Sequence, residues 1–218
     1  MYPVLNDIEV RILGCLIEKE LTTPEYYPLT LNSLTTACNQ KSNRDPVMNI
    51  EEGEVVAALD KLRFKGMARL SGVGGRVPKY CHSLAERLRL DEPELAVLAE
   101  LLLRGPQTMG ELRNRADRMS RFPDMGAIEA VLKELMDIDP PLVKLLPRQP
   151  GRKEQRYAHL LSGEPVVPLE EVDGRTAGAV GRGGESERMA KLEEEVSLLR
   201  NEVAELRRLV EEFKSQFE

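Results

Sequence analysis

The sequence predicts a mainly helical α+β fold in which a unit of three helices and a β-hairpin occurs twice. Three observations predict it. Apolar residues recur at helical spacing after two similar helix-start signatures. A glycine-rich or basic turn between two short strand-like runs follows the third helix of each unit. Both units close on Tyr-x-His, at residues 80–82 and 157–159.

The first helix of each unit begins with the same signature. Residues 5–10 (LNDIEV) align with residues 90–95 (LDEPEL) at an offset of 85. Asn6 and Asp91 are expected N-caps, each followed three residues later by a Glu, as in a capping box. The apolar residues that follow recur in steps of three and four, so we expect a helix with one buried face in each unit.

The second and third helices repeat as well. Residues 30–34 (TLNSL) match residues 108–112 (TMGEL) at an offset of 78. The apolar positions of the two third helices match at an offset of 73; they are Val55, Leu59 and Leu62 against Ile128, Leu132 and Leu135. Gly66 is expected to end one third helix in a left-handed conformation, and Asp139-Pro140-Pro141 is expected to end the other.

The third helix of each unit is followed by an expected hairpin, in residues 67–82 and 142–159. Three helices followed by a hairpin is the order of a winged helix-turn-helix domain, so the sequence predicts tandem winged helix-turn-helix domains plus a C-terminal coiled-coil helix. The expected segments are domains 1–85 and 86–163, a flexible linker 164–185 and a coiled-coil helix 186–218.

Two stretches give a family resemblance. TTPEYYPLTLNSLTTACNQKSNRDPVMN, with the Tyr-x-His hairpin and LLLRGPQTMGELRNRADRM, resembles the YceH-like family of bacterial cytoplasmic proteins over roughly residues 3–163. The resemblance implies a tandem winged-helix architecture in a family of uncharacterised molecular function. It therefore assigns no catalytic, cofactor or ligand residue.

Composition bounds the class of protein. No apolar run approaches the roughly 18 residues that span a bilayer, and the charged start lacks a signal-peptide pattern. Three cysteines without CxxC spacing suit a reducing compartment, so we expect a cytoplasmic protein. The net charge of −6 comes from residues 164–218, which carry 8 Lys/Arg and 14 Asp/Glu. The remainder is neutral and compatible with a nucleic-acid partner.

The third helices do not fit ordinary base reading. In a winged helix this helix usually enters the major groove. Here it begins with Glu51, Glu52 and Glu54, and the second unit places Asp124 and Glu129 at the same point. Carboxylates at a helix N-terminus are favoured by the helix dipole, but near DNA they face phosphates.

Basic and amide residues elsewhere are the expected nucleic-acid surface. They lie in the loop before the first unit's third helix, on both hairpins and around the second unit's second helix. They are Lys41, Asn43, Arg44, Arg76, Lys79, Arg113, Arg115, Arg118, Arg121, Arg148, Arg152, Lys153 and Arg156. The alternative is a solvated face, since interleaved carboxylates such as Glu111, Asp117 and Glu154 can pair with these cations locally.

The stretch CNQKSNRDPVMN, residues 38–49, allows two interpretations. Its amide and basic side chains suit base contacts, while its Asn, Ser and Asp-Pro elements suit a long turn held by its own hydrogen bonds. No metal site or enzyme activity is expected. The two histidines occupy equivalent hairpin positions, which indicates a structural role, and Cys15 and Cys38 fall in apolar helical patterns.

The C-terminal segment carries a heptad seam, with apolar residues in alternating steps of three and four. Its central members, and the expected dimerisation residues, are Leu192, Val196, Leu199, Val203, Leu206 and Val210. The g–e′ pairs Arg188–Glu193, Glu195–Arg200 and Glu202–Arg207 are of opposite sign in a parallel pair. We therefore expect a parallel homodimer; the alternative is one helix docked on its own body.

The sequence suggests two functions, and the first is slightly preferred because the basic hairpin of the second unit is harder to explain otherwise. The first is a non-enzymatic regulator that binds double-stranded DNA through its basic hairpins. The second is a protein-interaction adaptor that uses winged-helix surfaces, favoured by the acidic third helices and the neutral body. The DNA hypothesis requires that its cations are not neutralised within the molecule.

Overall fold

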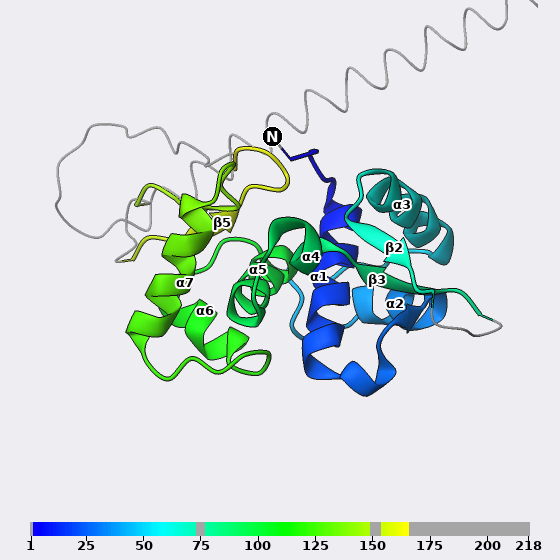
Figure 1. The fold of residues 1–218 in the computed structure, drawn as a ribbon, viewed down its shortest axis with the longest axis horizontal. Helices are drawn as coiled ribbons and strands as arrows, with labels where there is room; N and C mark the ends of the chain where they lie inside the picture. The colour runs from blue at the N-terminus through cyan, green and yellow to red at the C-terminus, as the bar shows by residue number, and fades with distance from the viewer. Residues whose placement is uncertain (1, 73–76, 149–153, 166–218) are drawn as a thin grey trace, which may run out of the picture. The chain divides into compact units, whose positions relative to one another are not determined.

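The computed structural model describes residues 2–72, 77–148 and 154–165, which lie in one compact unit, Met1–Pro168. Within these residues the fold is mainly helical with two small antiparallel sheets (Figure 1). The elements are α1 Asp7–Thr22, a 3-10 turn Pro24–Tyr26, β1 Leu29–Thr30, α2 Leu31–Cys38, α3 Glu52–Phe64, β2 Ala68–Leu70, β3 Lys79–His82, α4 Leu84–Leu88, α5 Glu92–Arg104, α6 Met109–Ala116, α7 Met125–Asp137, β4 Val143–Leu145 and β5 Tyr157–His159.

The order of three helices and a hairpin occurs twice among the described elements. It appears as α1, α2, α3, β2, β3 and again as α5, α6, α7, β4, β5, with the short helix α4 between them. Residue 85, the expected end of the first domain, falls inside α4. The expected coiled-coil helix and its dimerisation residues lie outside the described residues.

The first sheet has one more strand than the sequence suggested. Its order is β1-β3-β2, because Leu29 and Thr30 pair with Tyr80 and Lys79 ahead of α2. A two-residue strand has too few residues to show a period of two, so periodicity could not reveal it. The second sheet contains β4 and β5 alone.

The expected helix starts are confirmed. The side chain of Asn6 accepts the Glu9 backbone N–H at 2.9 Å, and Glu9 accepts the Asn6 N–H at 2.8 Å. Asp91 and Glu94 make the same reciprocal pair at 2.9 and 2.8 Å. Each box satisfies two N–H groups that the first turn of a helix leaves without partners. Gly66, with φ of 68°, follows α3 in the expected left-handed conformation.

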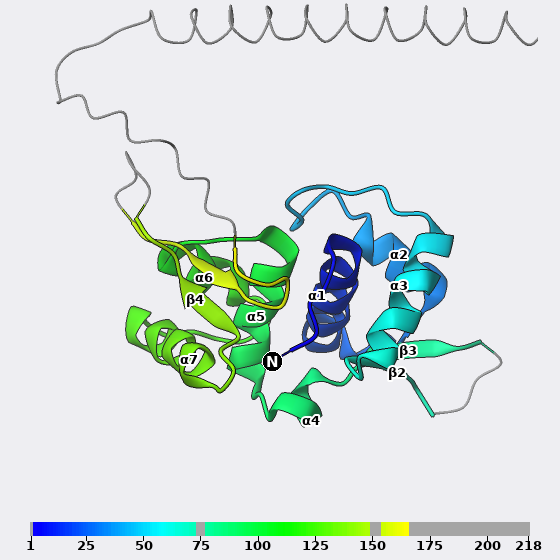
Figure 2. The ribbon, with the colours of Figure 1, turned by 90° about the horizontal axis from the view of Figure 1, so that it is seen from above.

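The core is built on α1 and α5, which lie side by side in the centre of the unit (Figures 1 and 2). They approach closely at Gly14, where an added Cβ would lie 3.0 Å from Leu103 Cδ2 and 3.1 Å from Leu102 Cβ. Both leucines are buried. The missing side chain at Gly14 therefore lets the first helices of the two repeats pack against each other.

The segment after α2 is held by its own hydrogen bonds. The Asn39 side chain accepts the Ile50 N–H at 2.7 Å and donates to the Ile50 carbonyl at 2.8 Å, which closes the loop at its ends. Asn43 adopts a positive φ of 56°, and the Asp45 N–H donates to the Leu103 carbonyl at 3.0 Å. These contacts favour the turn interpretation of this stretch and fix it to α5.

Both hairpin histidines lie at the ends of strands next to the core. His82 Nδ1 accepts the Leu84 N–H at 3.2 Å, while Nε2 faces the Glu20 carboxylate. His159 Nδ1 has no hydrogen-bond partner among the described residues, and burial lowers the pKa of His159 to about 4. The folded unit therefore holds His159 neutral.

Gly14→Leu should destabilise the protein by about 1–3 kcal/mol, because new side-chain atoms must enter the contact between α1 and α5. The matched control is Gly110→Leu in α6, where an added Cβ meets nothing within 4 Å. Urea unfolding of both variants checks this. Equal stability of the two variants would contradict the close packing of these helices.

The folded protein should lose stability as the pH falls from about 6.5 toward 4. The unfolded chain takes up a proton on His159 near its ordinary pKa of about 6.5, whereas the folded chain resists it until about 4. Urea midpoints measured across this range should fall less in His159→Gln than in the wild type. Parallel pH profiles would show that His159 is not held neutral.

Candidate interaction surfaces

The expected nucleic-acid residues are divided by the structure into buried, paired and exposed groups. Arg76, Arg152 and Lys153 lie outside the described residues. The contacts of the remaining residues decide to which group each one belongs.

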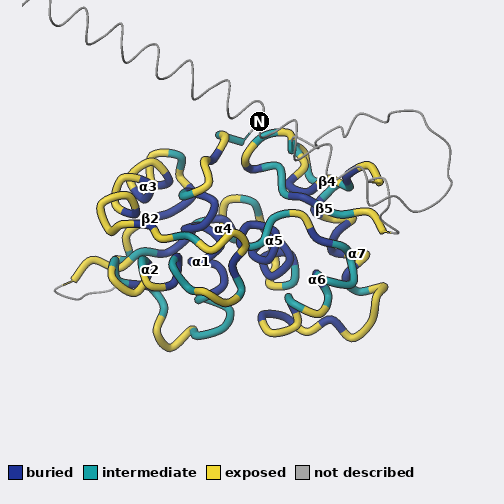
Figure 3. The backbone as a smooth tube through the Cα atoms, turned by 180° about the vertical axis from the view of Figure 1, so that it is seen from behind, coloured by how far each residue is buried: buried dark blue, intermediate teal, exposed yellow. Residues whose placement is uncertain are grey.

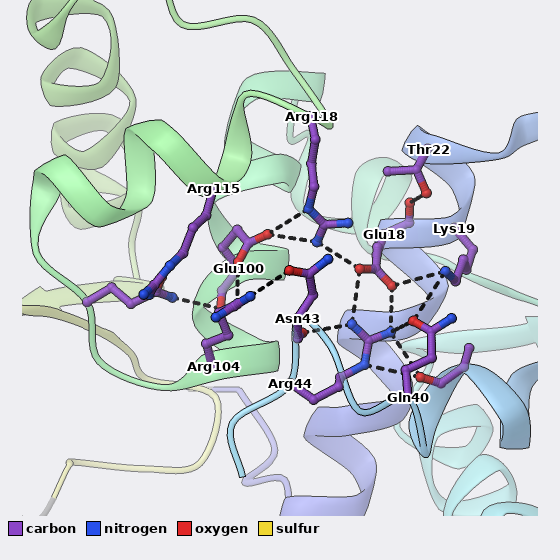
Figure 4. Close-up of polar contacts among 12 residues, drawn as sticks. Glu18, Lys19, Thr22, Gln40, Asn43, Arg44, Glu100, Arg104, Arg115 and Arg118 are labelled. Atoms are coloured by element: carbon purple, nitrogen blue, oxygen red, sulfur yellow. Dashed lines mark hydrogen bonds and ion pairs between the residues drawn. The ribbon is translucent and has the colours of Figure 1, made fainter. Parts of the chain in front are cut away.

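Arg44 lies in the interior. Its side chain is 0% exposed and its guanidinium clasps both carboxylate oxygens of Glu18, at 3.0 and 2.6 Å (Figure 4). The remaining donors bond the Ala37 carbonyl, Gln40 and the Asn43 carbonyl. A guanidinium with no exposed face cannot approach a phosphate, so we remove Arg44 from the expected contact surface; it is a structural residue of the loop.

Arg118 completes a charge network between the two repeats. Its guanidinium lies 2.7 Å from Glu18 of α1 and 2.8 Å from Glu100 of α5 (Figure 4). Arg104 reaches Glu100 at 3.5 Å and donates to the Asn43 side chain at 2.6 Å. Two buried carboxylates and the three arginines Arg44, Arg104 and Arg118 thus join α1, α5 and two loops.

The network sets the protonation of Glu18. Burial raises the pKa of this carboxyl, but the hydrogen bonds and charge of Arg44, together with the charge of Arg118, outweigh burial and hold the pKa below its ordinary value. Glu18 is therefore ionised at neutral pH. A signal for this network was present in the sequence, because Glu18 and Glu100 interrupt apolar helix faces, but their partners are distant in the chain.

Three further expected contacts are used inside the second repeat. Arg115 and Arg156 lie 3.5 and 3.3 Å from the carboxylate of Glu111, and Arg156 also donates to the Pro106 carbonyl at 2.7 Å. Arg113 donates to the carbonyls of Phe122 and Pro123 at 3.3 and 3.0 Å. These bonds hold α6, its following loop and β5 together.

Lys41, Lys79 and Arg121 are exposed and make no ion pair among the described residues, and Arg148 is exposed with contacts of its own. Lys79 belongs to β3 and Arg121 to the connection between α6 and α7. These elements lie on opposite sides of the α1–α5 pair (Figure 1). Lys79 and Arg121 therefore do not share one face of the molecule.

The outward side of α3 is another exposed surface (Figure 3). Val55, Ala58, Leu59 and Leu62 are buried, so the opposite side of the helix faces solvent. The residues in the middle of that opposite side are Gly53, Ala57, Asp60 and Phe64, which we call the α3 stripe. Phe64 is 95% exposed, and space around Gly53 is open.

The equivalent stripe on α7 differs from the α3 stripe at its last two positions. At the repeat offset of 73, its members are Gly126, Ala130, Lys133 and Asp137, all exposed. The two small residues are shared, but Asp137 stands where α3 has Phe64. The pair of helices therefore provides an internal comparison for any role of the α3 stripe.

Thiol chemistry, metal binding and membrane insertion have little support in the described residues. Cys15, Cys38 and Cys81 are free thiols and buried. The described part of the chain contains no group of three or more His, Cys, Asp or Glu residues placed to hold a metal ion. Among the same residues, no helix is long and apolar enough to cross a membrane.

Comparison with known proteins gives a family. A family model described as "Protein of unknown function, DUF480" matches residues 5–152. The chain belongs to the DUF480 family. A UPF0502 protein of Geotalea uraniireducens is 69% identical over 215 residues, 98% of each chain. One from Geobacter sulfurreducens is 65% identical over 219 residues, 99% of each chain. In these DUF480 relatives the likeness extends well beyond residue 152, into the C-terminal segment.

Glu18→Gln should destabilise this DUF480 protein by about 3–5 kcal/mol at neutral pH, because Arg44 stays buried without its counter-charge. The difference from the wild type should shrink below about pH 4. A carboxyl with a lowered pKa stabilises the fold above its unfolded-state pKa of about 4.3 and loses that contribution as it is protonated.

Asp60→Asn is the control, since the Asp60–Arg63 pair is exposed and pairs of this kind contribute about 0–1 kcal/mol. Urea unfolding at pH 7 and pH 3.5 gives the comparison. A cost for Glu18→Gln no larger than that of the control would show that the network does not hold the repeats together.

Proposed function

We propose that this DUF480 chain is a non-enzymatic protein-interaction module of the cytoplasm. Its body comprises two winged-helix domains, each of three helices and a hairpin, and its C-terminal helix forms a parallel coiled-coil dimer. The α3 stripe is the surface that meets a protein partner. The repeated order of elements supports the tandem winged-helix interpretation.

The observation that carries this proposal is the chemistry of the α3 stripe. A helix that reads bases presents donors and acceptors to the groove, most often from Arg, Lys, Asn or Gln. The α3 stripe instead presents Gly53, Ala57, Asp60 and a fully exposed Phe64, and the helix begins with Glu51 and Glu52. Aromatic side chains of this kind are typical anchors of protein interfaces.

The charge network supports the same choice. Arg44, Arg115, Arg118 and Arg156 neutralise carboxylates of their own chain, so their capacity to release counterions from DNA is reduced. The body is electrically neutral over residues 1–163. A surface of mixed, locally paired charge is suited to a protein partner.

DNA binding is the second candidate, favoured by the exposed and unpaired Lys41, Lys79 and Arg121 of the described residues. Contacts of this kind are made with phosphates and do not select a sequence. The affinity they give would fall steeply with rising salt.

Capture from native cells on the full chain should yield a protein whose retention falls at least tenfold with Phe64→Ala. Loss of a buried aromatic anchor commonly costs more than the roughly 1.4 kcal/mol of a tenfold change. Asp137→Ala, at the equivalent position of α7, is the control and should retain the partner.

The same preparations are titrated with duplex DNA at low salt. Absence of a Phe64-dependent protein, together with DNA binding lost in the variant Lys41→Gln/Lys79→Gln/Arg121→Gln, would reverse the order of the two candidates.

A further inference from the structure

The α3 stripe has a spacing that reads the same in both directions. Its members Gly53, Ala57, Asp60 and Phe64 are separated by steps of four, three and four residues. Such steps keep one seam of a helix facing a partner helix. A palindromic seam matches itself when a second copy is turned to run antiparallel, with the two-fold axis midway between Ala57 and Asp60.

In that arrangement the largest residue meets the smallest. Phe64 of one copy lies opposite Gly53 of the other, each about 8 Å from the two-fold axis at 1.5 Å of rise per residue. Gly53 leaves open space, and Phe64 is 95% exposed and without cover. Ala57 lies opposite Asp60, whose carboxylate is already paired with Arg63 of its own helix at 3.1 Å. The stripe therefore pairs a knob with a hole at each end.

The flanking charges agree with the antiparallel direction. Glu54 and Lys61 lie on the same side of the stripe, and the two-fold operation brings Glu54 of one copy beside Lys61 of the other. Lys61 is exposed and has no ion pair among the described residues. A parallel pairing would instead set Asp60 against Asp60 and Phe64 against Phe64, leaving both Gly53 positions unfilled.

We propose that the α3 stripe is an isologous docking surface for a second copy of this chain. The inference rests on the proposed function, in that α3 binds protein and not bases, and it names the partner. A single pair of helices buries less than the roughly 1,200–2,000 Å² of a stable interface. The contact is therefore weak by itself and is strengthened wherever two copies are already held together.

The neighbouring surface extends the apolar end of the stripe. Lys65 Nζ donates to the Val4 carbonyl at 2.9 Å, so Val4, which is 61% exposed, lies beside the C-terminal end of α3. Lys65 itself is held by Glu9 at 2.8 Å. Val4 thus adds a second exposed apolar side chain near the C-terminal end of α3.

The test is cross-linking of the full chain through Ala57→Cys with a short bis-maleimide at micromolar concentration. Ala57 lies next to the proposed axis, while the native cysteines are buried and give the background in the wild type. Ala130→Cys is the matched control, because it is exposed at the equivalent position of α7. Any dimerisation through the C-terminal helix raises the local concentration at both positions alike, so the difference between them reports on α3.

We expect at least fivefold more cross-linked dimer from Ala57→Cys than from Ala130→Cys, and a return to the control level when Phe64→Glu is added. Phe64 is exposed, so this change should leave the unfolding midpoint in place. Equal cross-linking at the two positions, or cross-linking that survives Phe64→Glu, would overturn the second-copy assignment.

The outcome also separates this inference from the proposed function. If α3 does not cross-link but a different protein is captured through Phe64, the second-copy assignment is wrong and the interaction function stands. If α3 neither cross-links nor captures a protein, both are wrong.

Discussion

The fold of this DUF480 protein depends on one buried interaction, the pairing of Glu18 and Glu100 with Arg44 and Arg118. The carboxylates come from the first helices of the two repeats, and the arginines come from the loops after the second helices. Buried charges are costly unless each one is satisfied. The arrangement of α1 against α5 gives each of these carboxylates an arginine partner and is therefore favoured over packings that leave them unpaired, and the apolar contact at Gly14 fits the same arrangement.

This constraint has a consequence for the surface. Several arginines that the sequence predicted as a basic surface instead contact Glu18 and Glu100 between the repeats, or Glu111 of α6. The features left for a partner to recognise are the shape and the apolar residues of the exposed helices. The α3 stripe stands out among them because a fully exposed Phe64 follows two small residues on the same line of the helix.

The two repeats share a scaffold and differ in what they expose. Both use a capped first helix, a third helix with a similar buried side and a two-stranded hairpin. On the outward side, Gly53 and Ala57 correspond to Gly126 and Ala130, whereas Phe64 corresponds to Asp137. Burial restricts the inner positions because their volume must match the core, while the outer positions are left to distinguish the two surfaces.

The sequence by itself determined the local features: the caps at Asn6 and Asp91, the left-handed Gly66 and the helical period of the buried residues. These depend on contacts within four residues, which a sequence displays directly. Only the tertiary structure decided that β1 joins the first sheet and that Arg44 is internal. It also decided which carboxylate each cation meets, because Glu18 and Arg118 are 100 positions apart in the chain. A sequence gives the number of charged side chains. Their availability to a partner depends on which of these side chains the packed helices bring together.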